Sequence, residues 1–344
     1  MAKIRVGLVF GGKSGEHEVS IRSAKSIYES LDKSKYEVVL LGVDKKGLWH
    51  RIDQKWLPEG PEMKSLPGGD KGITVQEEKA DVFFPIIHGT FGEDGCVQGL
   101  FELMDTAYVG AGVLGSAVGM DKEIQKKLLK YAGIQTADFK VIKSLGDLKN
   151  IKIKKYPVFV KPANMGSSVG IGMCNNKGEL EKAVKEAFLY DIKVLVEEEV
   201  VGREIEISVL GNFNPVASLP GEVIPKGHSF YDYEAKYIDE NGAELLIPAK
   251  LPKSKIKEIQ KLAVKTFITL ECAGMARVDM FLKPDGKLIV NEINTIPGFT
   301  SISMYPKLWE ATGLTYSKLL DRLIDLALDK KREKDKLKRD FRKV

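Results

Sequence analysis

The sequence predicts a protein of several domains that combines α/β and α+β architecture. Its 344 residues exceed the length of one ordinary domain. Strand and helix patterns alternate along the first third of the chain, as in a parallel α/β sheet, whereas longer strand-like runs dominate beyond residue 198. We expect an N-terminal α/β domain at 1–111, a small central α+β domain at 112–197, a sheet-rich C-terminal domain at 198–329 and a basic tail at 330–344.

The expected N-terminal domain opens on a buried strand at 4–10, IRVGLVF, because this run is short, apolar and followed by glycines. A helix is expected near 17–31, where apolar side chains recur at helical spacing. Two further strands are expected in YEVVLLGVD (36–44) and ADVFFPIIHG (80–89). Residues 45–75 are rich in turn-forming residues and predict no clear element.

The central domain is expected to begin with a helical pattern over 112–135 that ends at Gly133, since glycine commonly terminates a helix. The strand YPVFVKP, a helix at 178–190 and a strand at 193–197 complete it. The C-terminal domain is expected to contain a helix at 252–271 and strands in GREIEISVLG, PVASLPGEVI, MARVDMFL and KLIVNEINT.

The net charge of +5 comes from the tail. Residues 330–344 carry nine Lys or Arg and three Asp or Glu, and subtracting these from the chain's 53 basic and 48 acidic residues leaves 44 and 45. Because the rest of the chain is nearly neutral, we expect no nucleic-acid partner. The tail alone could bind RNA or an anionic surface, but we favour a solvated, partly helical terminus.

The three cysteines, Cys96, Cys174 and Cys272, are too few and too far apart for a disulfide framework or a zinc site. This usage is typical of a reduced cytosol. The N-terminus runs directly into the first expected strand, without the pattern of a signal peptide. No apolar stretch reaches the about 20 residues that span a membrane. We therefore expect a cytoplasmic protein with no membrane partner.

The segment MARVDMFLKPDGKLIVNEINT carries the strongest chemical signal. Asp285-Gly286 between two apolar runs is typical of a two-residue hairpin turn. That turn would place Asp279 opposite Glu292 and Phe281 opposite Val290. Two carboxylates on directly opposite residues, whose Cβ atoms are about 5 Å apart, repel unless a cation lies between them.

The same register places Arg277 opposite Asn294, on the face that carries Asp279 and Glu292, since side chains alternate along a strand. The oxygen atoms of Asp, Glu and Asn are ligands that magnesium accepts. We therefore expect Asp279, Glu292 and Asn294 to bind metal. The alternative is a solvated sheet face on which Arg277 bridges two acids.

Residues 7–14, GLVFGGKS, match the P-loop pattern, but Leu8, Val9 and Phe10 already belong to the expected strand. A P-loop needs these residues in the loop after the strand, so we reject that interpretation. A glycine turn that opens a helix remains, and the helix N-terminus could attract an anion or position Glu16. Glu16 could also serve only to favour the start of the helix.

Two further loops could bind a ligand. In KPANMGSSVGIG, Lys161 ends a strand, and small residues around Ser167 and Ser168 would let the backbone approach phosphate oxygens. Such a loop can equally be a flexible connector. HGTFGEDG begins with His88 at the end of a strand, where ligands bind in open α/β sheets. A lone histidine there can also satisfy only local hydrogen bonds.

The segment FYDYEAKY at 230–237 places three tyrosines near Lys236 within the loop 227–246. Its length and polarity suit a lid that excludes water from a reaction. The alternative is an exposed aromatic loop.

Taken together, these motifs resemble the D-alanine–D-alanine ligases, a family of ATP-grasp enzymes. The segments that carry the resemblance, in the family's order, are GGKSGEHEVS, HGTFGEDG, MDK, KPANMGSSVG, EEEVVGREIE, FYDYEAKY, RVD and NEINTIPGFTSIS. They extend from residue 1 to about 325, and their combination is far more specific than any one of them. The resemblance implies an ATP-grasp fold behind an N-terminal substrate-binding domain, and a homodimer.

The resemblance also implies roles for single residues. ATP would be bound by Lys122, Lys161, Glu197, Glu204 and Lys236. Two magnesium or manganese ions would be bound by Asp279, Glu292 and Asn294. The substrate would contact His88, Ser303 and Met304. The catalytic residues would be Glu16, Ser167, Tyr237, Arg277 and Gly298.

Among the catalytic residues, Glu16 would orient the ammonium of the first D-alanine and would be linked through Ser167 to Tyr237 of the lid. Arg277 and the backbone of Gly298 would stabilise the oxyanion. The implied reaction joins two D-alanines with ATP, through an acyl-phosphate, for peptidoglycan synthesis.

Three alternatives to this function remain open. The second substrate could be D-lactate or D-serine, although the intact YEAKY segment with Tyr237 favours the dipeptide. The chain could be another ATP-grasp carboxylate–amine ligase, against which the FYDYEAKY segment argues. It could also be a silent nucleotide-binding module, although its acidic ligands, lysines and Arg277 are all retained.

Overall fold

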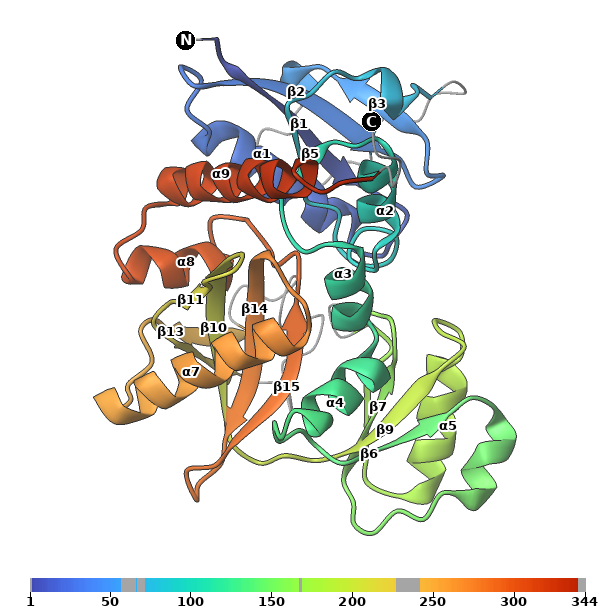
Figure 1. The fold of residues 1–344 in the computed structure, drawn as a ribbon. Helices are drawn as coiled ribbons and strands as arrows, with labels where there is room; N and C mark the ends of the chain where they lie inside the picture. The colour runs from blue at the N-terminus through green and yellow to red at the C-terminus, as the bar shows by residue number, and fades with distance from the viewer. Residues whose placement is uncertain (1, 57–65, 67–71, 167–168, 227–241, 340–344) are drawn as a thin grey trace.

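The fold consists of β-sheets flanked by helices. The computed structural model describes residues 2–56, 66, 72–166, 169–226 and 242–339. Within them the chain forms an N-terminal sheet, a central sheet and a C-terminal sheet. In Figure 1 the N-terminal sheet lies at the top, and the C-terminal and central sheets lie beside each other below it. The mixture of parallel α/β and antiparallel sheets confirms the predicted fold class.

The N-terminal sheet is largely parallel, as the alternation of strands and helices predicts. Its strand order is β3-β2-β1-β4-β5, with β1, β2, β4 and β5 parallel and β3 antiparallel to β2. The strands are β1 (Ile4–Gly11), β2 (Tyr36–Val43), β3 (Trp49–Ile52), β4 (Val82–Pro85) and β5 (Ala107–Tyr108). The helices are α1 (His17–Ser30) and α2 (Cys96–Leu103), with short 3-10 turns at Gln54–Trp56 and Val75–Glu77.

The turn after β1 confirms that GLVFGGKS is not a P-loop. Leu8, Val9 and Phe10 are buried in β1 and pair with β2, and Leu8 and Val9 also pair with β4. Gly11 and Gly12 then take φ angles of 92° and 99°, which glycine adopts without the penalty of a Cβ atom. This tight turn leads the chain into α1.

The central sheet is antiparallel, in the order β6-β9-β7-β8. Its strands are β6 (Phe139–Ile142), β7 (Val158–Pro162), β8 (Gly172–Cys174) and β9 (Val194–Glu198). Its helix α5 (Lys177–Ala187) and a 3-10 segment, Leu145–Asn150, pack on it. Its apolar core includes Val160, Val184 and Val196.

The single helical pattern expected over 112–135 is two helices, α3 (Val113–Met120) and α4 (Lys122–Tyr131). Asp121 between them is extended, with ψ 101°, and its side chain accepts a hydrogen bond from the amide of Ile124 at 3.1 Å. The expectation was wrong because a capping aspartate starts a new helix where the apolar period alone suggests continuity.

The C-terminal sheet has the order β13-β12-β10-β14-β15, with β11 also paired to β10. Its strands are β10 (Arg203–Gly211), β11 (Val216–Ala217), β12 (Gly221–Pro225), β13 (Ala243–Leu246), β14 (Gly274–Leu282) and β15 (Leu288–Asn294), and α7 (Lys253–Thr269) packs on the sheet. The strand expected in PVASLPGEVI is interrupted between β11 and β12, where Pro220 has no amide hydrogen to donate to a ladder.

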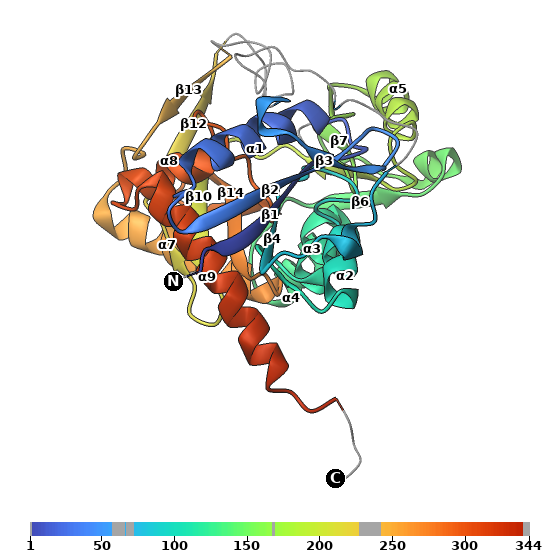
Figure 2. The same ribbon diagram turned by 90° about the horizontal axis from the view of Figure 1, so that it is seen from above.

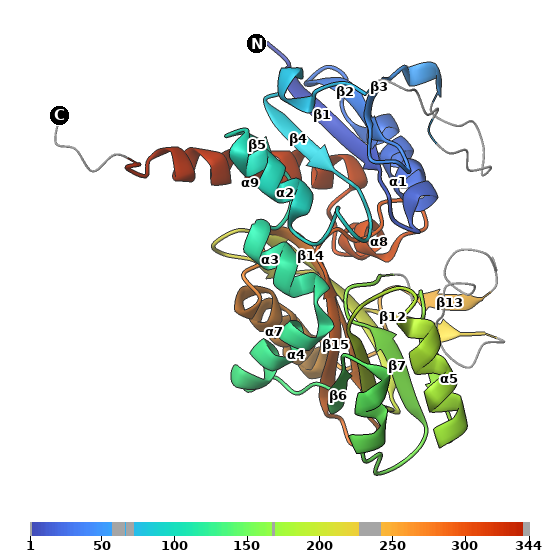
Figure 3. The same ribbon diagram turned by 90° about the vertical axis from the view of Figure 1, so that its right-hand side faces the viewer.

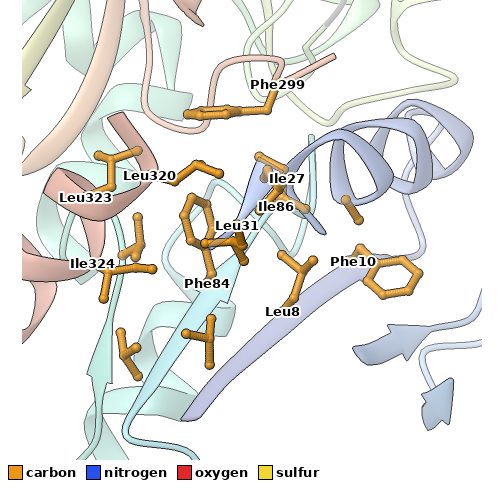
Figure 4. Close-up of a cluster of buried hydrophobic side chains, with 14 of the residues drawn as sticks. Leu8, Phe10, Ile27, Leu31, Phe84, Ile86, Phe299, Leu320, Leu323 and Ile324 are labelled. Carbon is orange, nitrogen blue, oxygen red and sulfur yellow. The ribbon is translucent and has the colours of Figure 1, made fainter. Parts of the chain in front are cut away.

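The last helices return the chain to its beginning. After α8 (Met304–Ala311), α9 (Tyr316–Asp335) runs beside the N-terminal sheet, as Figures 2 and 3 show. Leu320, Leu323 and Ile324 of α9 join Leu8 and Phe84 in one buried cluster (Figure 4). The expected boundary at residue 329 therefore falls inside a helix that packs on the first domain.

The basic tail is tied down at its start. Lys330 lies 4.7 Å from the ring centroid of Tyr108 and donates to the carbonyl of Gly110 at 3.3 Å. Lys334 bonds to Glu102, and Arg339 bonds to Asp105 at 3.0 Å. The expectation of a partly helical terminus is confirmed. Most residues from 331 to 339 are exposed, as expected of a solvated terminus, but Lys330 and Lys334 are partly buried by these contacts.

The three thiols are free, with Cys174 and Cys272 buried and Cys96 exposed, which confirms that no disulfide framework exists. Among the described residues, no helix is both long and apolar enough to cross a membrane.

Candidate active site

Several of the predicted site residues that the structure describes lie near one another, where the central and C-terminal sheets meet. Helix α4 and strands β7 and β9 of the central domain meet β14 and β15 of the C-terminal domain (Figures 1 and 3). Contacts of Lys122 with Glu292 and of Lys161 with Asn291 join the two domains. The N-terminal domain reaches the same region through Glu16 and His88.

The hairpin of β14 and β15 confirms the register predicted for the metal ligands. Asp279 pairs with Glu292, and Arg277 pairs with Asn294. The expectation for the outer part was wrong, since Phe281 faces Ile289 rather than Val290.

A different turn and a β-bulge explain this result. The amide of Lys283 donates to the carbonyl of Lys287, and Gly286 has φ 81°. These features define a three-residue loop with a left-handed glycine, which shifts the expected register by one. The ladder then shifts back between Asp279 and Met280, which leaves Asn291 as the extra residue of the bulge. The two shifts cancel at the site.

Arg277 and three acidic residues lie side by side across this sheet. Glu206 of β10 pairs with Asp279, which pairs with Glu292. Arg277 donates to both carboxylate oxygens of Asp279, at 2.7 and 2.6 Å, and its Nε lies 3.1 Å from Glu206. Burial lowers the pKa of Arg277, but the charges of Asp279 and Glu206 raise it far more, so the guanidinium stays charged.

Asn294 completes the acidic face by donating through Nδ2 to Asp279 at 3.1 Å. Across the described residues, the side chains as they lie form no group of three His, Cys, Asp or Glu that could hold a metal ion. Asp279, Glu292 and Asn294 nevertheless present only hard oxygen donors, and these are the atoms that magnesium binds.

Lys122 brings a positive charge to the acidic face. It is the first residue of α4 and is buried, and its ammonium donates to the carbonyl of Met165 at 2.7 Å. The same ammonium lies 3.8 Å from the carboxylate of Glu292. A cation from the central domain therefore stands beside a predicted metal ligand of the C-terminal domain.

Lys161 lies in the same region. Its ammonium donates to Glu197 Oε2 at 2.8 Å and to Asn291 Oδ1 at 3.2 Å. Burial lowers the pKa of Lys161, but the charge of Glu197 and then those of Glu292 and Glu204 raise it above its ordinary value. Glu204 of β10 therefore acts on Lys161 electrostatically, although no contact between them is needed for this effect.

Glu16 lies at the meeting of the N-terminal and central domains. It caps α1 by position, but its side chain makes no capping hydrogen bond to the helix, which argues against a role limited to starting the helix. A Cβ atom at Gly89 would lie 2.6 Å from Glu16 Oε2, and one at Gly166 would lie 2.8 Å from it. The carboxylate therefore rests between HGTFGEDG and the glycine-rich loop.

His88 is buried and linked to the loop that follows β15. Its Nδ1 donates to the carbonyl of Ile296 at 3.0 Å, and its Nε2 lies 3.1 Å from Ser23 Oγ, which accepts from the amide of Phe299 at 3.3 Å. Burial lowers the pKa of His88, but its ionic contact with Glu93, whose Oε1 lies 3.6 Å from Nδ1, raises it overall.

The loop with Gly298 packs on the start of α8. A Cβ atom at Gly298 would lie 2.8 Å from Ser303 Oγ, and Ser303 Oγ accepts from the amide of Thr300 at 3.0 Å. Ser303 thus fixes the shape of this loop. Met304 is buried in a small core with Val223 and Leu308, so its packing gives it a structural role.

Three of the predicted residues, Ser167, Lys236 and Tyr237, lie outside the described residues. The sequence analysis in turn missed Glu206, Lys126 and Asn291. The alternation in REIEIS places Glu206 on the face of Glu204, and Lys126 follows Lys122 by one helical turn, so both signals were present. The bulge places Asn291 beside Lys161, and no sequence pattern predicted this bulge.

Comparison with known proteins matches nearly the whole chain. Residues 5–111 match the family model "D-ala D-ala ligase N-terminus", and residues 128–325 match "D-ala D-ala ligase C-terminus". The chain is 48% identical to a D-alanine–D-alanine ligase of Oceanobacillus iheyensis, with 98% of each covered. It is 50% identical to one from Thermoanaerobacter sp., covering 97% of this chain and 99% of the relative.

Solved structures agree with these relatives. The D-alanine–D-alanine ligase from Coxiella burnetii superposes with a TM-score of 0.85 at 40% identity, covering 98% of this chain and 97% of that one. The VanG D-Ala:D-Ser ligase from Enterococcus faecalis gives 0.81 at 34% identity, covering 95% and 100%. With both family models matched in order and full-length relatives at this identity, the chain belongs to the D-alanine–D-alanine ligase family.

Proposed function

We propose that the protein uses ATP to join two D-alanines into D-alanyl-D-alanine for peptidoglycan synthesis. The observation that carries this proposal is the 3.8 Å approach of Lys122 to Glu292. It brings a cation suited to phosphate next to a carboxylate suited to metal, at the meeting of two domains. Phosphoryl transfer needs this combination, because its catalysis consists mainly of positioning and charge stabilisation.

In the first step, the carboxylate of one D-alanine attacks the γ-phosphate of ATP and forms an acyl-phosphate and ADP. Lys122 and Lys161 would neutralise the charge on the phosphates, while Glu197 and Glu204 would contact the adenine and ribose, with Lys236 as a further ATP contact. Glu16 would hold the ammonium of the first D-alanine, with its carboxylate between Gly89 and Gly166. His88 would lie near that substrate's carboxylate.

In the second step, the amine of another D-alanine attacks the activated carbonyl, and phosphate leaves. Arg277 and the backbone of Gly298 would stabilise the oxyanion that forms. Ser303 would contribute to the second site, and Met304 would support it from the core. Acyl-phosphates hydrolyse readily, so the segment with Tyr237, linked through Ser167 to Glu16, would act as a lid that excludes water.

Magnesium or manganese is the cofactor that this chemistry implies. Asp279, Glu292 and Asn294 would hold two such ions, and their oxygen donors fit hard divalent cations. The bound metal would offset negative charge on the phosphates. Arg277 would keep Asp279 oriented, given its two hydrogen bonds to that carboxylate.

We further infer a cytoplasmic homodimer that takes D-alanine and ATP as its substrates and has no nucleic-acid or membrane partner. The proposed domains are 1–111, 112–197 and 198–329. The lid loop, expected at 227–246, is proposed to end before residue 243, because Ala243–Leu246 form β13 of the sheet. The helix α9 adds a C-terminal element to the first of them, because its apolar face packs on the N-terminal sheet.

The decisive experiment measures ADP formation with ATP and magnesium in the presence of D-alanine or L-alanine. We expect ADP and phosphate with D-alanine only, and no dependence on the D-isomer would refute the proposal. The relative from Enterococcus faecalis is named a D-Ala:D-Ser ligase, so the second substrate needs its own test. Product analysis with D-alanine, D-serine and D-lactate should yield the D-alanine dipeptide as the main product.

A further inference from the structure

Lys126 is a buried lysine that neither step of the proposed reaction uses. It lies on α4, one turn after Lys122, and its side chain is 1% exposed. Its ammonium stands 3.3 Å from Glu197 Oε1, and it donates to the carbonyl of Asn291 at 3.3 Å. A charged group is rarely buried so completely unless an opposite charge lies beside it.

Glu197 is shared by two ammonium groups. Lys126 approaches one of its carboxylate oxygens and Lys161 donates to the other at 2.8 Å, while the Glu197 side chain is 2% exposed. Asn291, the bulge residue, touches both lysines, with its carbonyl toward Lys126 and its side-chain oxygen toward Lys161. The four residues form one buried network between the central and C-terminal domains.

The two lysines differ in their freedom to move. The side chain of Lys126 is enclosed at 1% exposure, whereas that of Lys161 is 13% exposed. The partner of Lys126 beyond Glu197 is a backbone carbonyl, whereas that of Lys161 is a side-chain amide that can rotate. Lys161 is therefore the member of the pair that can turn toward a phosphate.

Such a turn changes the charge balance of the network. If Lys161 binds ATP phosphate, as the proposed function requires, it weakens its bond to Glu197. A buried carboxylate left without a cation is strongly destabilising. We propose that Lys126 is a positioning residue that remains as the countercharge of Glu197 and thereby frees Lys161 for the phosphates of ATP.

The electrostatics of the network agree with this assignment. Burial lowers the pKa of Lys126, the charge of Glu197 opposes that effect, and the nearby charge of Lys161 lowers the pKa further. When Lys161 turns away, that repulsion weakens and Lys126 holds its proton more firmly. Lys126 is therefore most firmly protonated when Glu197 has lost its contact with Lys161.

The test measures ATP binding by calorimetry with ATP and magnesium, without D-alanine, in Lys126→Met, Glu197→Gln and the double variant. In Lys126→Met, Glu197 retains only Lys161, so we expect the Kd for ATP to rise at least about tenfold, equivalent to about 1.4 kcal/mol. Adding Glu197→Gln removes the carboxylate that holds Lys161. The double variant should therefore bind ATP within about threefold of Glu197→Gln alone.

Lys127→Met is the matched control. Lys127 is the next residue on α4, but its side chain is 60% exposed and pairs with Glu123 at 2.6 Å. The Lys127→Met variant loses the same charge as Lys126→Met, but from outside the network, so its Kd for ATP should equal that of the wild type. Steady-state kinetics should show a raised KM for ATP in Lys126→Met and an unchanged KM for D-alanine.

Two results would overturn the inference. One is a wild-type Kd for ATP in Lys126→Met. The other is a raised Kd in Lys126→Met that stays equally raised in the double variant relative to Glu197→Gln alone. Should Lys126→Met fail to fold, the comparison of the double variant with Glu197→Gln decides, and a difference above about tenfold contradicts the proposed role. The proposed function is tested separately, because wild-type protein that binds ATP but forms no ADP with D-alanine refutes that function alone.

Discussion

Arg277 donates two hydrogen bonds to the carboxylate of Asp279, at 2.7 and 2.6 Å. The two residues are two positions apart on β14, so their side chains lie on the same face of the strand. The two residues were predicted to do different things, one to stabilise an oxyanion and the other to bind metal. Their bidentate contact means that neither can move without the other. The geometry therefore couples the proposed oxyanion site to the proposed metal site.

Replacement of Arg277 by methionine should lower kcat by about 10²-fold or more, as removal of an oxyanion donor does elsewhere. It should also lower the melting temperature, because Asp279 and Glu206 would lose the guanidinium that lies within 3.1 Å of each. Removal of one partner from a buried ion pair costs about 3–5 kcal/mol. Steady-state kinetics well below the melting temperature separate the two effects.

Arg203→Met is the control for Arg277→Met. Arg203 makes a similar bidentate contact with Glu222 on the same sheet, at 2.7 and 2.6 Å, but is 40% exposed and lies outside the proposed site. Its loss should leave kcat within about threefold of the wild type, since it contacts no reacting group. Equal kcat values in the two variants would exclude Arg277 from the chemical step.

Replacement of Asp279 by asparagine should raise the magnesium concentration for half-maximal activity at least about tenfold, because a neutral amide binds a hard cation more weakly than a carboxylate does. The measurement is a magnesium titration of ADP formation at saturating ATP and D-alanine. Asp285→Asn removes the same charge from the turn of the same hairpin and should not shift the titration. An unshifted curve for Asp279→Asn would contradict the metal assignment.

The sequence predicted the pairing of Asp279 with Glu292 correctly, although it predicted the turn wrongly. The true loop is one residue longer than the Asp285-Gly286 turn, and the bulge at Asn291 compensates. The period of two fixed which side chains share a face, since a one-residue slip would bury the wrong set. The bulge itself could not be predicted, because nothing distinguishes Asn291 from any other strand residue until its lysine partners are placed.

The C-terminal helix was harder to predict for a different reason. The residues from Lys330 onward look like a solvated tail because their charge is unbalanced locally. Their partners, Glu102 and Asp105, lie more than 200 residues away in the sequence. Pairing over such a separation depends on the tertiary fold, and no local pattern carries it. The helices and glycine-rich loops of the site, in contrast, depend on local sequence patterns and could be predicted from them.

The buried pair of His88 and Glu93 should make stability depend on pH. Glu93 and burial act in opposite directions on the pKa of His88, and the net effect raises it. A histidine with a raised pKa in the folded state stabilises that state fully below its unfolded pKa of about 6.5. This stabilisation is lost as the pH rises through the folded-state pKa.

Glu93→Gln should therefore destabilise the protein more at pH 6 than at pH 9. The difference in unfolding free energy at pH 6 should be up to about 1 kcal/mol, as for an ion pair that is not closely hydrogen-bonded. Denaturant unfolding at both pH values measures it. Glu78→Gln is the control, because it breaks a contact with Arg51 that involves no histidine, so its effect should be the same at both pH values. A Glu93→Gln effect that grows with pH would refute the assignment.

The contact between Lys334 and Glu102 should attach the end of α9 to the N-terminal domain. The two side chains are 37% and 35% exposed, and Glu102 also accepts from Tyr108 at 2.5 Å. Partly exposed pairs contribute about 0.2–1 kcal/mol. Lys334→Met should therefore lower the melting temperature by roughly 1–4 °C, with ADP formation unchanged.

Lys336→Met supplies the comparison, because Lys336 bonds at 2.5 Å only to Glu333 of its own helix among the contacts found in the described residues. It removes an equal charge from the same terminus, and its melting temperature should match that of the wild type. In a Glu102→Gln background, Lys334→Met should have no further effect, since the contact is already gone. If Lys334→Met and Lys336→Met melt alike, the contact between Lys334 and Glu102 does not attach the helix, and Lys334 remains available for an anionic partner.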